Sequence, residues 1–161
     1  MKLPTYLLCC LLSFSACQQG AAVNELPFGY EYVDRGGYLK EIYKSTDPKQ
    51  FVLARVIQYK YNMQFLLILQ EPILSEHLNH IASDINATYP RSLTSTKDSV
   101  SNLMHMRDSI MQHDPYFSAI FRNKYNFWIA TPQKLFGPYN FDEYYKKRIE
   151  LGVPEGLKLE I

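Results

Sequence analysis

The sequence predicts an α+β fold, in which two to three helices pack on one face of an antiparallel sheet. Short runs of aromatic and β-branched residues, separated by turn residues, fill the stretch 30–69 and return at 125–136, as is typical of strands. Between them, in residues 74–111, apolar side chains recur at the three- and four-residue spacing of helices. A helix with recognisable start and stop signals then follows Asn140.

The first strands are predicted at 30–33 and 38–43, joined by a glycine-containing turn. Two more apolar runs, at 51–57 and 63–69, flank a hairpin turn expected around 59–62. Both runs are apolar on both of their faces. We therefore expect this hairpin at the centre of the sheet, with helices on one face and the other face at least partly covered.

Two helices are predicted in the middle of the chain. Leu74, Leu78, Ile81 and Ile85 lie on one helical face, and Pro90 ends that helix. A second apolar stripe precedes Pro115 and consists of Val100, Leu103, Met104, Ile110 and Met111. Stripes of this kind are typical of core packing, so we expect both helices to bury these side chains.

The last third returns to strand and then to helix. Alternation over 125–129 predicts a strand, which a turn folds back before Gly137-Pro138 breaks it. Asn140 is suited to cap the next helix, and Glu143 at the third helical position completes a capping box. Gly152 is placed to end this helix in the left-handed conformation.

The same helix carries opposite charges at four-residue spacing. We expect ion pairs between Asp142 and Lys146 and between Glu143 and Lys147 on its exposed side. After the helix, Leu157, Leu159 and Ile161 alternate with other residues and predict a closing strand.

Three parts follow one another along the chain. Residues 1–16 are predicted to be a signal peptide, residues 17–25 a flexible tether and residues 26–161 a single α+β domain. The formal net charge is +1. Nucleic-acid-binding proteins need a clustered positive surface, so we expect no nucleic acid among the partners.

The leader has the three parts of a secretory signal. Lys2 precedes the apolar stretch Leu3–Phe14, and the small residues Ser15-Ala16 follow. The apolar stretch is shorter than the ~20 residues that a spanning helix requires. All three cysteines lie at positions 9, 10 and 17, so the folded part contains neither a disulfide nor a thiolate nucleophile.

Residues 14–17, Phe-Ser-Ala-Cys, resemble the lipobox of bacterial lipoprotein signals, although Phe14 stands where leucine is usual. The resemblance implies cleavage before Cys17, a diacylglycerol on its sulfur and acylation of the new amino terminus. Gln18 in place of aspartate implies sorting to the outer membrane, facing the periplasm. The alternative is a secreted protein cut near Ala21-Ala22, which would carry no lipid anchor.

A second resemblance involves both ends of the domain. A strand, a turn, Gly137-Pro138 and a capped helix ending at 150–154 follow one another between Lys124 and Leu159, and residues 26–30 read Leu-Pro-Phe-Gly-Tyr. This order resembles the signature of a family of small bacterial lipoproteins classed as a domain of unknown function. The resemblance does not cover the helical middle, 74–122. It implies a shared fold and brings no catalytic residue.

Histidines are the best candidates for chemistry. His77 and His80 are three residues apart on the first predicted helix, with carboxylates four residues to either side of His80, and His105 and Asp108 form a similar pair. Such spacings can bind zinc. Because no His-Glu-x-x-His motif is present, and such pairs usually face solvent, we predict no metal site, no catalytic residue and no cofactor. An envelope hydrolase or metal-dependent enzyme using the His77/His80 helix is the alternative.

Tyrosine is abundant, with 13 residues beside nine phenylalanines and one tryptophan. The predicted first hairpin and the turn after it hold Tyr30, Tyr32, Tyr38, Tyr43, Tyr59 and Tyr61. An exposed patch of these rings would suit sugar or protein binding, although tyrosines at the rim of a small core are commoner. We therefore expect a non-enzymatic, lipid-anchored domain that binds an envelope protein or glycan, with a sugar-binding protein as a further alternative.

Overall fold

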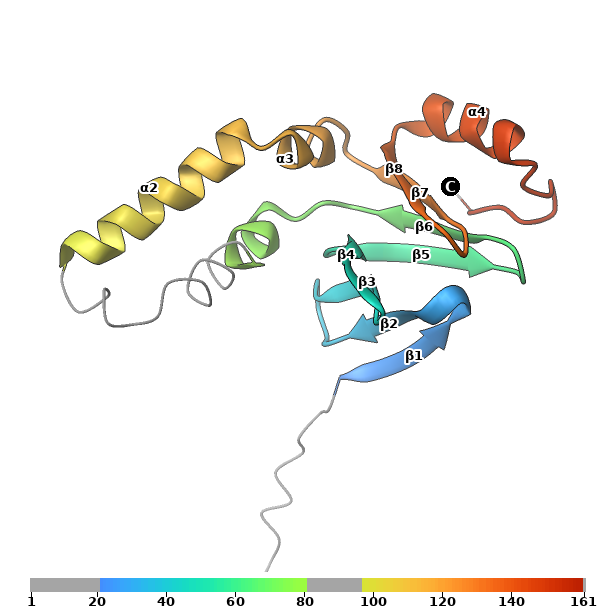
Figure 1. Ribbon diagram of the computed structural model, residues 1–161, viewed down its shortest axis with the longest axis horizontal. Helices are drawn as coiled ribbons and strands as arrows, with labels where there is room; N and C mark the ends of the chain where they lie inside the picture. Colours follow the sequence, from blue (N-terminus) through green and yellow to red (C-terminus); the bar gives the residue numbers. More distant parts are fainter. Residues whose placement is uncertain (1–20, 81–96, 161) are drawn as a thin grey trace, which may run out of the picture.

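A computed structural model describes residues 21–80 and 97–160, which contain two four-stranded antiparallel sheets and several helices, so the predicted α+β class is confirmed. The strand orders are β1-β2-β3-β4 in the first sheet and β5-β6-β7-β8 in the second (Figure 1). The strands are β1 (Ala22–Leu26), β2 (Tyr30–Asp34), β3 (Lys40–Lys44), β4 (Asp47–Val52), β5 (Val56–Tyr61), β6 (Leu66–Gln70), β7 (Asn126–Ala130) and β8 (Leu135–Tyr139). The helices are the 3₁₀ turn η1 (Pro27–Gly29), α2 (Lys97–His113), α3 (Pro115–Ile120) and α4 (Phe141–Leu151), and residues 74–80 are also helical.

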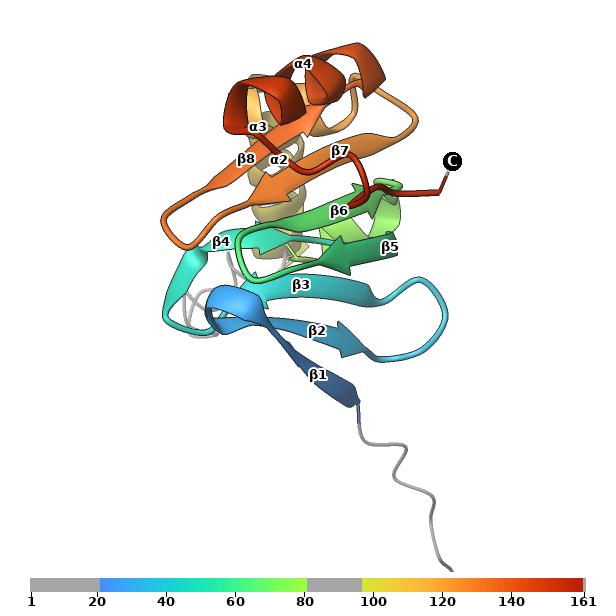
Figure 2. The ribbon, with the colours of Figure 1, turned by 90° about the vertical axis from the view of Figure 1, so that its right-hand side faces the viewer.

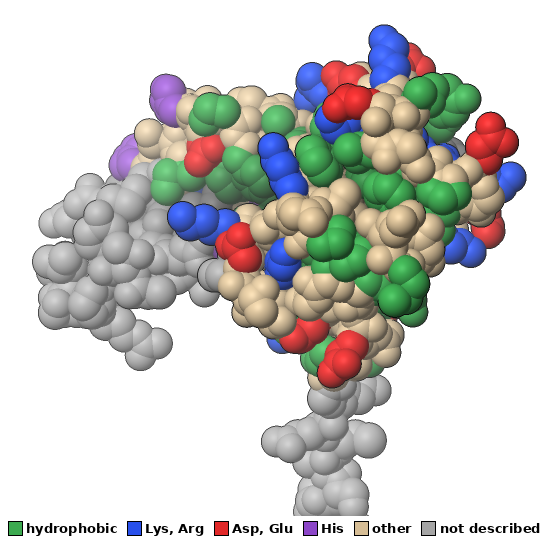
Figure 3. All heavy atoms as spheres, turned by 45° about the vertical axis from the view of Figure 1, so that its right-hand side comes forward, with side chains coloured by type: hydrophobic (Ala, Val, Ile, Leu, Met, Phe, Trp, Pro, Cys, Tyr) green, Lys and Arg blue, Asp and Glu red, His purple; other side chains and the backbone are tan. Residues whose placement is uncertain are grey.

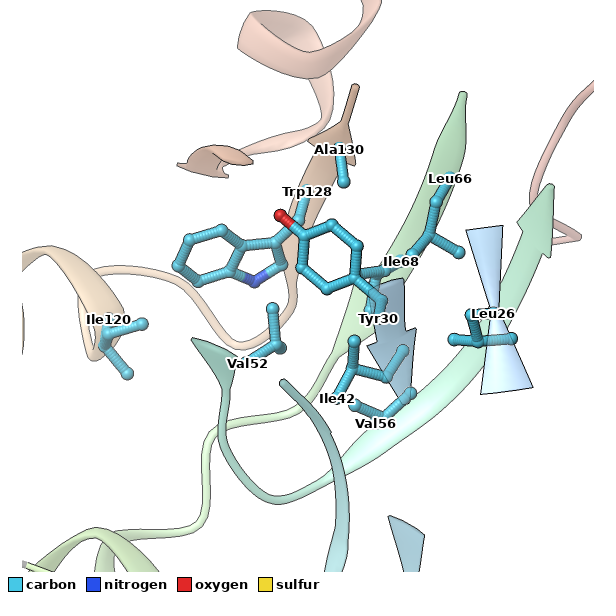
Figure 4. Close-up of a cluster of buried hydrophobic side chains, with 10 residues drawn as sticks. All are labelled: Leu26, Tyr30, Ile42, Val52, Val56, Leu66, Ile68, Ile120, Trp128 and Ala130. Carbon is cyan, nitrogen blue, oxygen red and sulfur yellow. The ribbon is translucent and has the colours of Figure 1, made fainter. Parts of the chain in front are cut away.

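The second sheet is buried on both faces. All five residues of β6 and all five of β7 are buried. Leu66 and Ile68 belong to a core shared with the first sheet and α3, whereas Leu67 and Leu69 belong to a core shared with α4 and the C-terminal segment. Figure 4 shows the first of these cores, in which Trp128 lies among side chains of both sheets. The two-sided apolar pattern therefore predicted the burial of β6 correctly. The other strand of the predicted hairpin, β5, lies at the edge of its sheet with three of its six residues exposed, so the hairpin is not central as expected.

One predicted strand is divided between the two sheets. Within the run 51–57, β4 ends at Val52 and β5 begins at Val56. The chain crosses from the first sheet to the second between these two residues. Both valines are buried in the same core, so apolar content gives no signal at the crossing. Backbone hydrogen bonds from Arg55 N to Glu71 O (2.7 Å) and from Glu71 N to Arg55 O (2.9 Å) hold the crossing segment.

The hairpin after β5 forms, but its predicted turn at 59–62 is wrong. Tyr59 and Tyr61 lie within β5, and the turn begins at Asn62. The Asn62 side-chain oxygen accepts hydrogen bonds from the backbone N–H groups of Gln64 and Phe65, both at 2.8 Å. Asparagine stabilises turns in this way, and it places the turn after the tyrosines rather than among them.

The tether is shorter than predicted. Residues 22–25, expected to be flexible, belong to β1, which pairs with β2 from Ala22 opposite Asp34 to Leu26 opposite Tyr30. The first four residues of β1 are exposed. The strand is therefore held by backbone pairing and leaves almost no apolar pattern in the sequence. The signal peptide at 1–16 and Cys17 lie outside the described residues.

Gly137-Pro138 does not break its strand, contrary to the prediction, because β8 continues through both residues to Tyr139. β8 is an edge strand, where a missing backbone N–H is tolerated. Gly137 has φ of +132°, and a Cβ atom there would lie 2.7 Å from Cε3 of Trp128 and 2.8 Å from the Phe127 carbonyl oxygen. This glycine lets β8 pass close over the tryptophan ring.

The capped helix is confirmed as α4. Asn140 accepts a hydrogen bond from Glu143 N and the Glu143 carboxylate accepts one from Asn140 N, both at 2.9 Å, and Gly152 adopts the left-handed conformation. The predicted i,i+4 ion pairs are wrong. Glu143 pairs with Arg122 at 2.7 Å and Lys147 pairs with Glu150 at 2.5 Å. Glu143 is already held by the cap, which directs its carboxylate away from Lys147.

The predicted closing strand is wrong for the described residues of the C-terminal segment, since 157–160 contain no strand. Leu159 is buried in the core under α4, and two carbonyl groups of the segment accept hydrogen bonds from the Arg148 guanidinium, Pro154 O at 3.1 Å and Leu157 O at 2.6 Å. The alternation of Leu157 and Leu159 therefore reflects packing of one side of this segment on the core, without pairing to a strand.

The helices between β6 and β7 pack differently from the prediction. β6 and β7 pair directly although residues 71–125 separate them, and α2 extends away from the sheets (Figure 1). Leu74 and Met104, predicted to be core residues, are each 52% exposed, while Ile110 and Met111 pack around Phe117 of α3. Ile81, Ile85 and Pro90 lie outside the described residues.

Candidate functional site

His77 is buried rather than solvent-exposed, which corrects the prediction for the His77/His80 helix. Its side chain has no exposed surface, and its ring meets those of Phe117 and Phe121 edge-on, at centroid distances of 6.3 and 5.1 Å. His80, one turn further on, stacks on Phe51 of β4 at 5.9 Å. The two histidines thus lie in an aromatic cluster that fixes their helix against α3 and the first sheet.

The His77 ring is held in an uncharged state. Its Nδ1 atom lies 3.0 Å from the carbonyl oxygen of Ile73 and donates to it, which leaves Nε2 as the bare acceptor. Nε2 is buried and has no hydrogen-bond partner among the described residues. Burial lowers the pKa of His77, and His80 contributes in the same direction. A buried neutral imidazole surrounded by rings is typical of packing.

The described residues assemble no metal centre, since no group of three or more His, Cys, Asp or Glu side chains converges within 21–80 and 97–160. His105 is exposed on α2, and the Asp108 carboxylate forms an ion pair with the Arg107 guanidinium at 2.8 Å. Asp84, one of the two carboxylates spaced around His80, lies outside the described part. The geometry therefore gives the metal-enzyme alternative no support.

A buried polar network, which the sequence did not indicate, lies at the junction of the two sheets. Gln70 Oε1 accepts hydrogen bonds from Trp128 Nε1 at 2.9 Å and from Asn126 Nδ2 at 3.2 Å, while Gln70 Nε2 donates to Leu53 O at 2.9 Å. Asn126 also donates to Ile120 O at 2.7 Å. Gln70 and Asn126 have no exposed surface, and their partners account for this burial. We therefore assign the network to the architecture.

The six tyrosines of the predicted patch separate in the structure. Tyr30 is 1% exposed and donates a hydrogen bond to Gln50 Oε1 at 2.6 Å. Tyr43 donates to Glu31, and Tyr38 lies against the guanidinium of Arg55. These three belong to the core or to other parts of the surface. The alternative of an exposed patch is therefore wrong for these three, and Tyr30 is buried in the core, as the preferred interpretation has it.

The other three form a row of rings that joins the two sheets, here called the tyrosine ladder: Tyr32 of β2, Tyr59 and Tyr61 of β5. The Tyr32 and Tyr59 rings are 5.0 Å apart and tilted by 45°. The Tyr59 and Tyr61 rings are 6.5 Å apart and nearly parallel, at 15°. Residues two apart on a strand share a face, so β5 by itself places its two rings side by side.

Exposure increases along the ladder. Tyr32 and Tyr59 are partly buried against the core, whereas Tyr61 is 50% exposed, and Met63 in the following turn is 89% exposed. Partial burial and the carboxylate of Asp34 raise the pKa of Tyr32 to about 12, so its hydroxyl stays protonated. Figure 3 shows hydrophobic side chains interrupting the charged surface in several places. The ladder ends at the exposed side chain of Tyr61, and it is the candidate binding surface.

Cys17, the predicted lipidation site, lies five positions before β1 and outside the described residues. A chain spans at most about 3.6 Å per residue, so β1 begins within about 18 Å of this cysteine. None of the described helices is long and apolar enough to cross a membrane.

Comparisons of the chain with models of protein families, with curated proteins and with solved structures give no match. The resemblance to small bacterial lipoproteins therefore stays a prediction from the residues quoted above.

Proposed function

We propose that this chain is a membrane-tethered, non-catalytic binding module of the bacterial cell envelope, anchored through acyl chains on Cys17. Its ligand surface is the tyrosine ladder with the adjoining Met63, and its partner is an envelope protein. The outer membrane, with the domain facing the periplasm, is the location that Gln18 favours.

The observation that carries the binding proposal is the ladder itself. Aromatic rings that end on an exposed turn offer a large contact area at a low cost in side-chain entropy, and tyrosine is enriched at interfaces for this reason. Tyr32 and Tyr59 are held by the core, so the surface is ordered before a partner arrives. Met63, almost fully exposed beside Tyr61, adds the adaptable apolar contact typical of protein interfaces.

The anchoring proposal rests on the leader and on chain length. Two or more acyl chains hold a protein durably at a bilayer, with ~0.8 kcal/mol for each buried methylene. The short distance from Cys17 to β1 would keep the first sheet close to the membrane. Mass spectrometry of the natural protein tests this part, because an unmodified amino terminus downstream of Cys17 would contradict it.

A crosslinking experiment in intact cells tests the binding surface. A photoreactive residue placed at Tyr61 is expected to capture one defined protein, and the same residue at Tyr38, which is 55% exposed but outside the ladder, is expected not to capture it. Changing Tyr59→Ala should abolish capture from position 61, since it removes the ring that supports Tyr61. Equal capture from both positions, or no effect of Tyr59→Ala, would reject the ladder as the binding surface.

Sugar binding is the second candidate, and the geometry of Tyr59 and Tyr61 favours it specifically. Two nearly parallel tyrosine rings 6.5 Å apart offer adjacent aromatic surfaces and two hydroxyl groups, the combination of apolar contact and hydrogen bonding that suits a sugar. Binding to a glycan array that disappears in the Tyr59→Ala/Tyr61→Ala double variant and persists in Tyr38→Ala would select this candidate. Array binding that survives the double variant would exclude the ladder as a sugar site.

A further inference from the structure

The outer side of α4 carries a stripe of large apolar side chains that the described residues leave more than half exposed, although the first of them, Phe141, touches the ring of Phe127 edge-on at 5.8 Å. Phe141, Tyr145 and Ile149 are 53%, 56% and 67% exposed. They are spaced four residues apart, so they form one row along the helix. Tyr144, which is 2% exposed, marks the side of α4 that faces the second sheet. We call Phe141, Tyr145 and Ile149 the α4 stripe.

We propose that the α4 stripe is a self-association surface, on which α4 of a second copy of this chain packs in the antiparallel direction. The argument rests on the register of α4 with itself. It is independent of the binding function proposed above.

The apolar side chains interdigitate when two copies of α4 are related by a twofold axis at the level of Tyr144. Residues of a helix rise by about 1.5 Å each, so stripe members are about 6 Å apart. Tyr145 of the second copy then lies midway between Phe141 and Tyr145 of the first. Phe141 of the second copy lies midway between Tyr145 and Ile149. Rows spaced by four residues fit into each other's grooves in the commonest class of helix packing.

The same register matches charges. With the twofold axis at Tyr144, Asp142 of each copy lies at the level of Lys146 of the other, which gives two equivalent opposite-charge pairs along the edge of the stripe. Within residues 21–80 and 97–160, neither Asp142 nor Lys146 forms an ion pair. Both side chains are exposed and are available to the second copy.

The position of α4 permits this pairing at a membrane. α4 and β1 lie at opposite sides of the molecule in both ribbon views (Figures 1 and 2). Successive helical residues are about 100° apart, so the stripe lies about 60–140° around the helix from Tyr144 and faces sideways. Two copies that pair sideways and antiparallel have their β1 strands on the same side, so both chains can be anchored in one bilayer.

The helix is preorganised for this contact. Both of its ends are capped, by Asn140 with Glu143 and by Gly152, so pairing orders no new backbone. The 11 residues of α4 span only about 16 Å, and one helix face covers less area than the ~800 Å² per partner of a standard interface. The association is therefore weak in solution, and crosslinking is the appropriate probe.

A single added cysteine in the mature full-length chain tests the proposal. A short bifunctional maleimide should join two copies of a Tyr145→Cys variant, since position 145 lies next to the twofold axis. The matched control is Tyr38→Cys, because Tyr38 is 55% exposed and Tyr145 56%. The parent mature chain, in which the proposed cleavage leaves Cys17 as the single cysteine, gives the background. Equal dimer yields at 145 and 38, or capture of a different protein at 145, would overturn the proposal.

Charge reversal supplies the second readout. In the Tyr145→Cys background, Asp142→Lys or Lys146→Asp places like charges opposite each other twice and should lower the dimer yield about 5- to 10-fold. The double reversal Asp142→Lys/Lys146→Asp recreates both pairs with the charges exchanged and should restore the yield. Asp142→Lys also replaces an acidic side chain in the first turn of α4 by a basic one, so a small and equal loss in melting temperature is expected for this single variant and for the double variant. A double variant no better than either single variant would reject the antiparallel register.

Discussion

Mild acidification should destabilise this protein through a single buried histidine. In the folded state, His77 is enclosed by Phe117 and Phe121, and burial lowers its pKa below the ordinary value of 6.5. In the unfolded chain the imidazole is solvated and binds a proton below about pH 6.5. A base whose pKa is lower in the folded state makes the unfolded state bind more protons. Stability is then full above pH 6.5 and falls as the pH is lowered.

The size of the effect follows from linkage. At pH 5.5, one pH unit below the unfolded pKa, proton binding favours the unfolded state by about 1.4 kcal/mol, and at pH 7.5 by less than about 0.1 kcal/mol. Because burial lowers the pKa of His77, the folded protein binds fewer protons at this ring than the unfolded chain does, and it offsets only part of this gain. We therefore expect the free energy of unfolding to fall by up to about 1.4 kcal/mol between pH 7.5 and 5.5 on account of His77.

The assay is urea denaturation of the protein and of a His77→Phe variant at half-unit intervals from pH 7.5 to 5.5. Phenylalanine keeps a ring in the cluster and cannot titrate, so the variant should lose this part of the pH dependence. His105→Gln, which removes an exposed histidine, is the matched control and should leave the slope unchanged. The reasoning is refuted if His77→Phe and the parent lose stability equally over this range.

Asp34 and Asp47, the two described carboxylates whose pKa is lowered, titrate below that range. The backbone N–H of Gly36 lowers the pKa of Asp34 below 3.8, and the side chain of Gln50 does the same for Asp47. A carboxylate with a lowered pKa stabilises the folded state above its unfolded value, and this contribution is lost only as the pH falls through the folded value. Both losses therefore occur below about pH 4, well outside the window assigned to His77.

Three substitutions test the architecture, with unfolding followed by the fluorescence of the only tryptophan. Gly137→Ala should cost about 2 kcal/mol, because its Cβ would lie 2.7 Å from Trp128, whereas Gly156→Ala in open space should change stability by less than about 0.5 kcal/mol. Gln70→Ala leaves the buried indole N–H without its acceptor and should cost about 2–4 kcal/mol. Asn140→Ala should cost about 1 kcal/mol and Asn140→Gly only a few tenths, and equal costs would deny the capping role.

Elements with local signals were predictable. The ends of α4 are set by side chains within the helix itself, Asn140 with Glu143 at the start and Gly152 at the end, so the sequence contains everything that determines them. The burial of β6 on both faces is likewise visible as an unbroken apolar run. The caps of α4 are formed by residues close together in the sequence. The burial of β6 follows from its apolar composition alone.

Features that depend on backbone pairing alone were not predictable. β1 is nearly all exposed and exists because β2 supplies its backbone hydrogen bonds, which leave no mark on side-chain choice. The step from β4 to β5 lies between two core valines, Val52 and Val56, so nothing in the apolar pattern marks the change of sheet. Backbone pairing with a neighbouring strand decides both features, and the side-chain pattern does not record it.

The candidate sites show the same limit. The tyrosine ladder forms because Tyr32 of the first sheet contacts Tyr59 of the second. The sequence shows the tyrosines, but it does not show that the strands divide into two sheets. His77 was predicted to be exposed because two histidines three residues apart on a polar helix face usually face solvent, whereas Leu74 was assigned to the core. The structure buries the histidine and exposes the leucine, because the rings of Phe117 and Phe121 accommodate a flat side chain edge-on.

The spacing of apolar residues along a helix predicts that one of its faces packs against a partner, but it does not identify that partner. α4 presents Tyr144 to its own sheet and, around the helix, a row of three side chains to the outside. A helix needs only one such face to fold, and exposed Phe141, Tyr145 and Ile149 reduce solubility unless something covers them. Capping fixes the helix without these three side chains, so their apolar character is not needed to form it. The α4 stripe thus adds apolar surface that the fold of α4 does not require. For this reason we look for an intermolecular contact at the stripe.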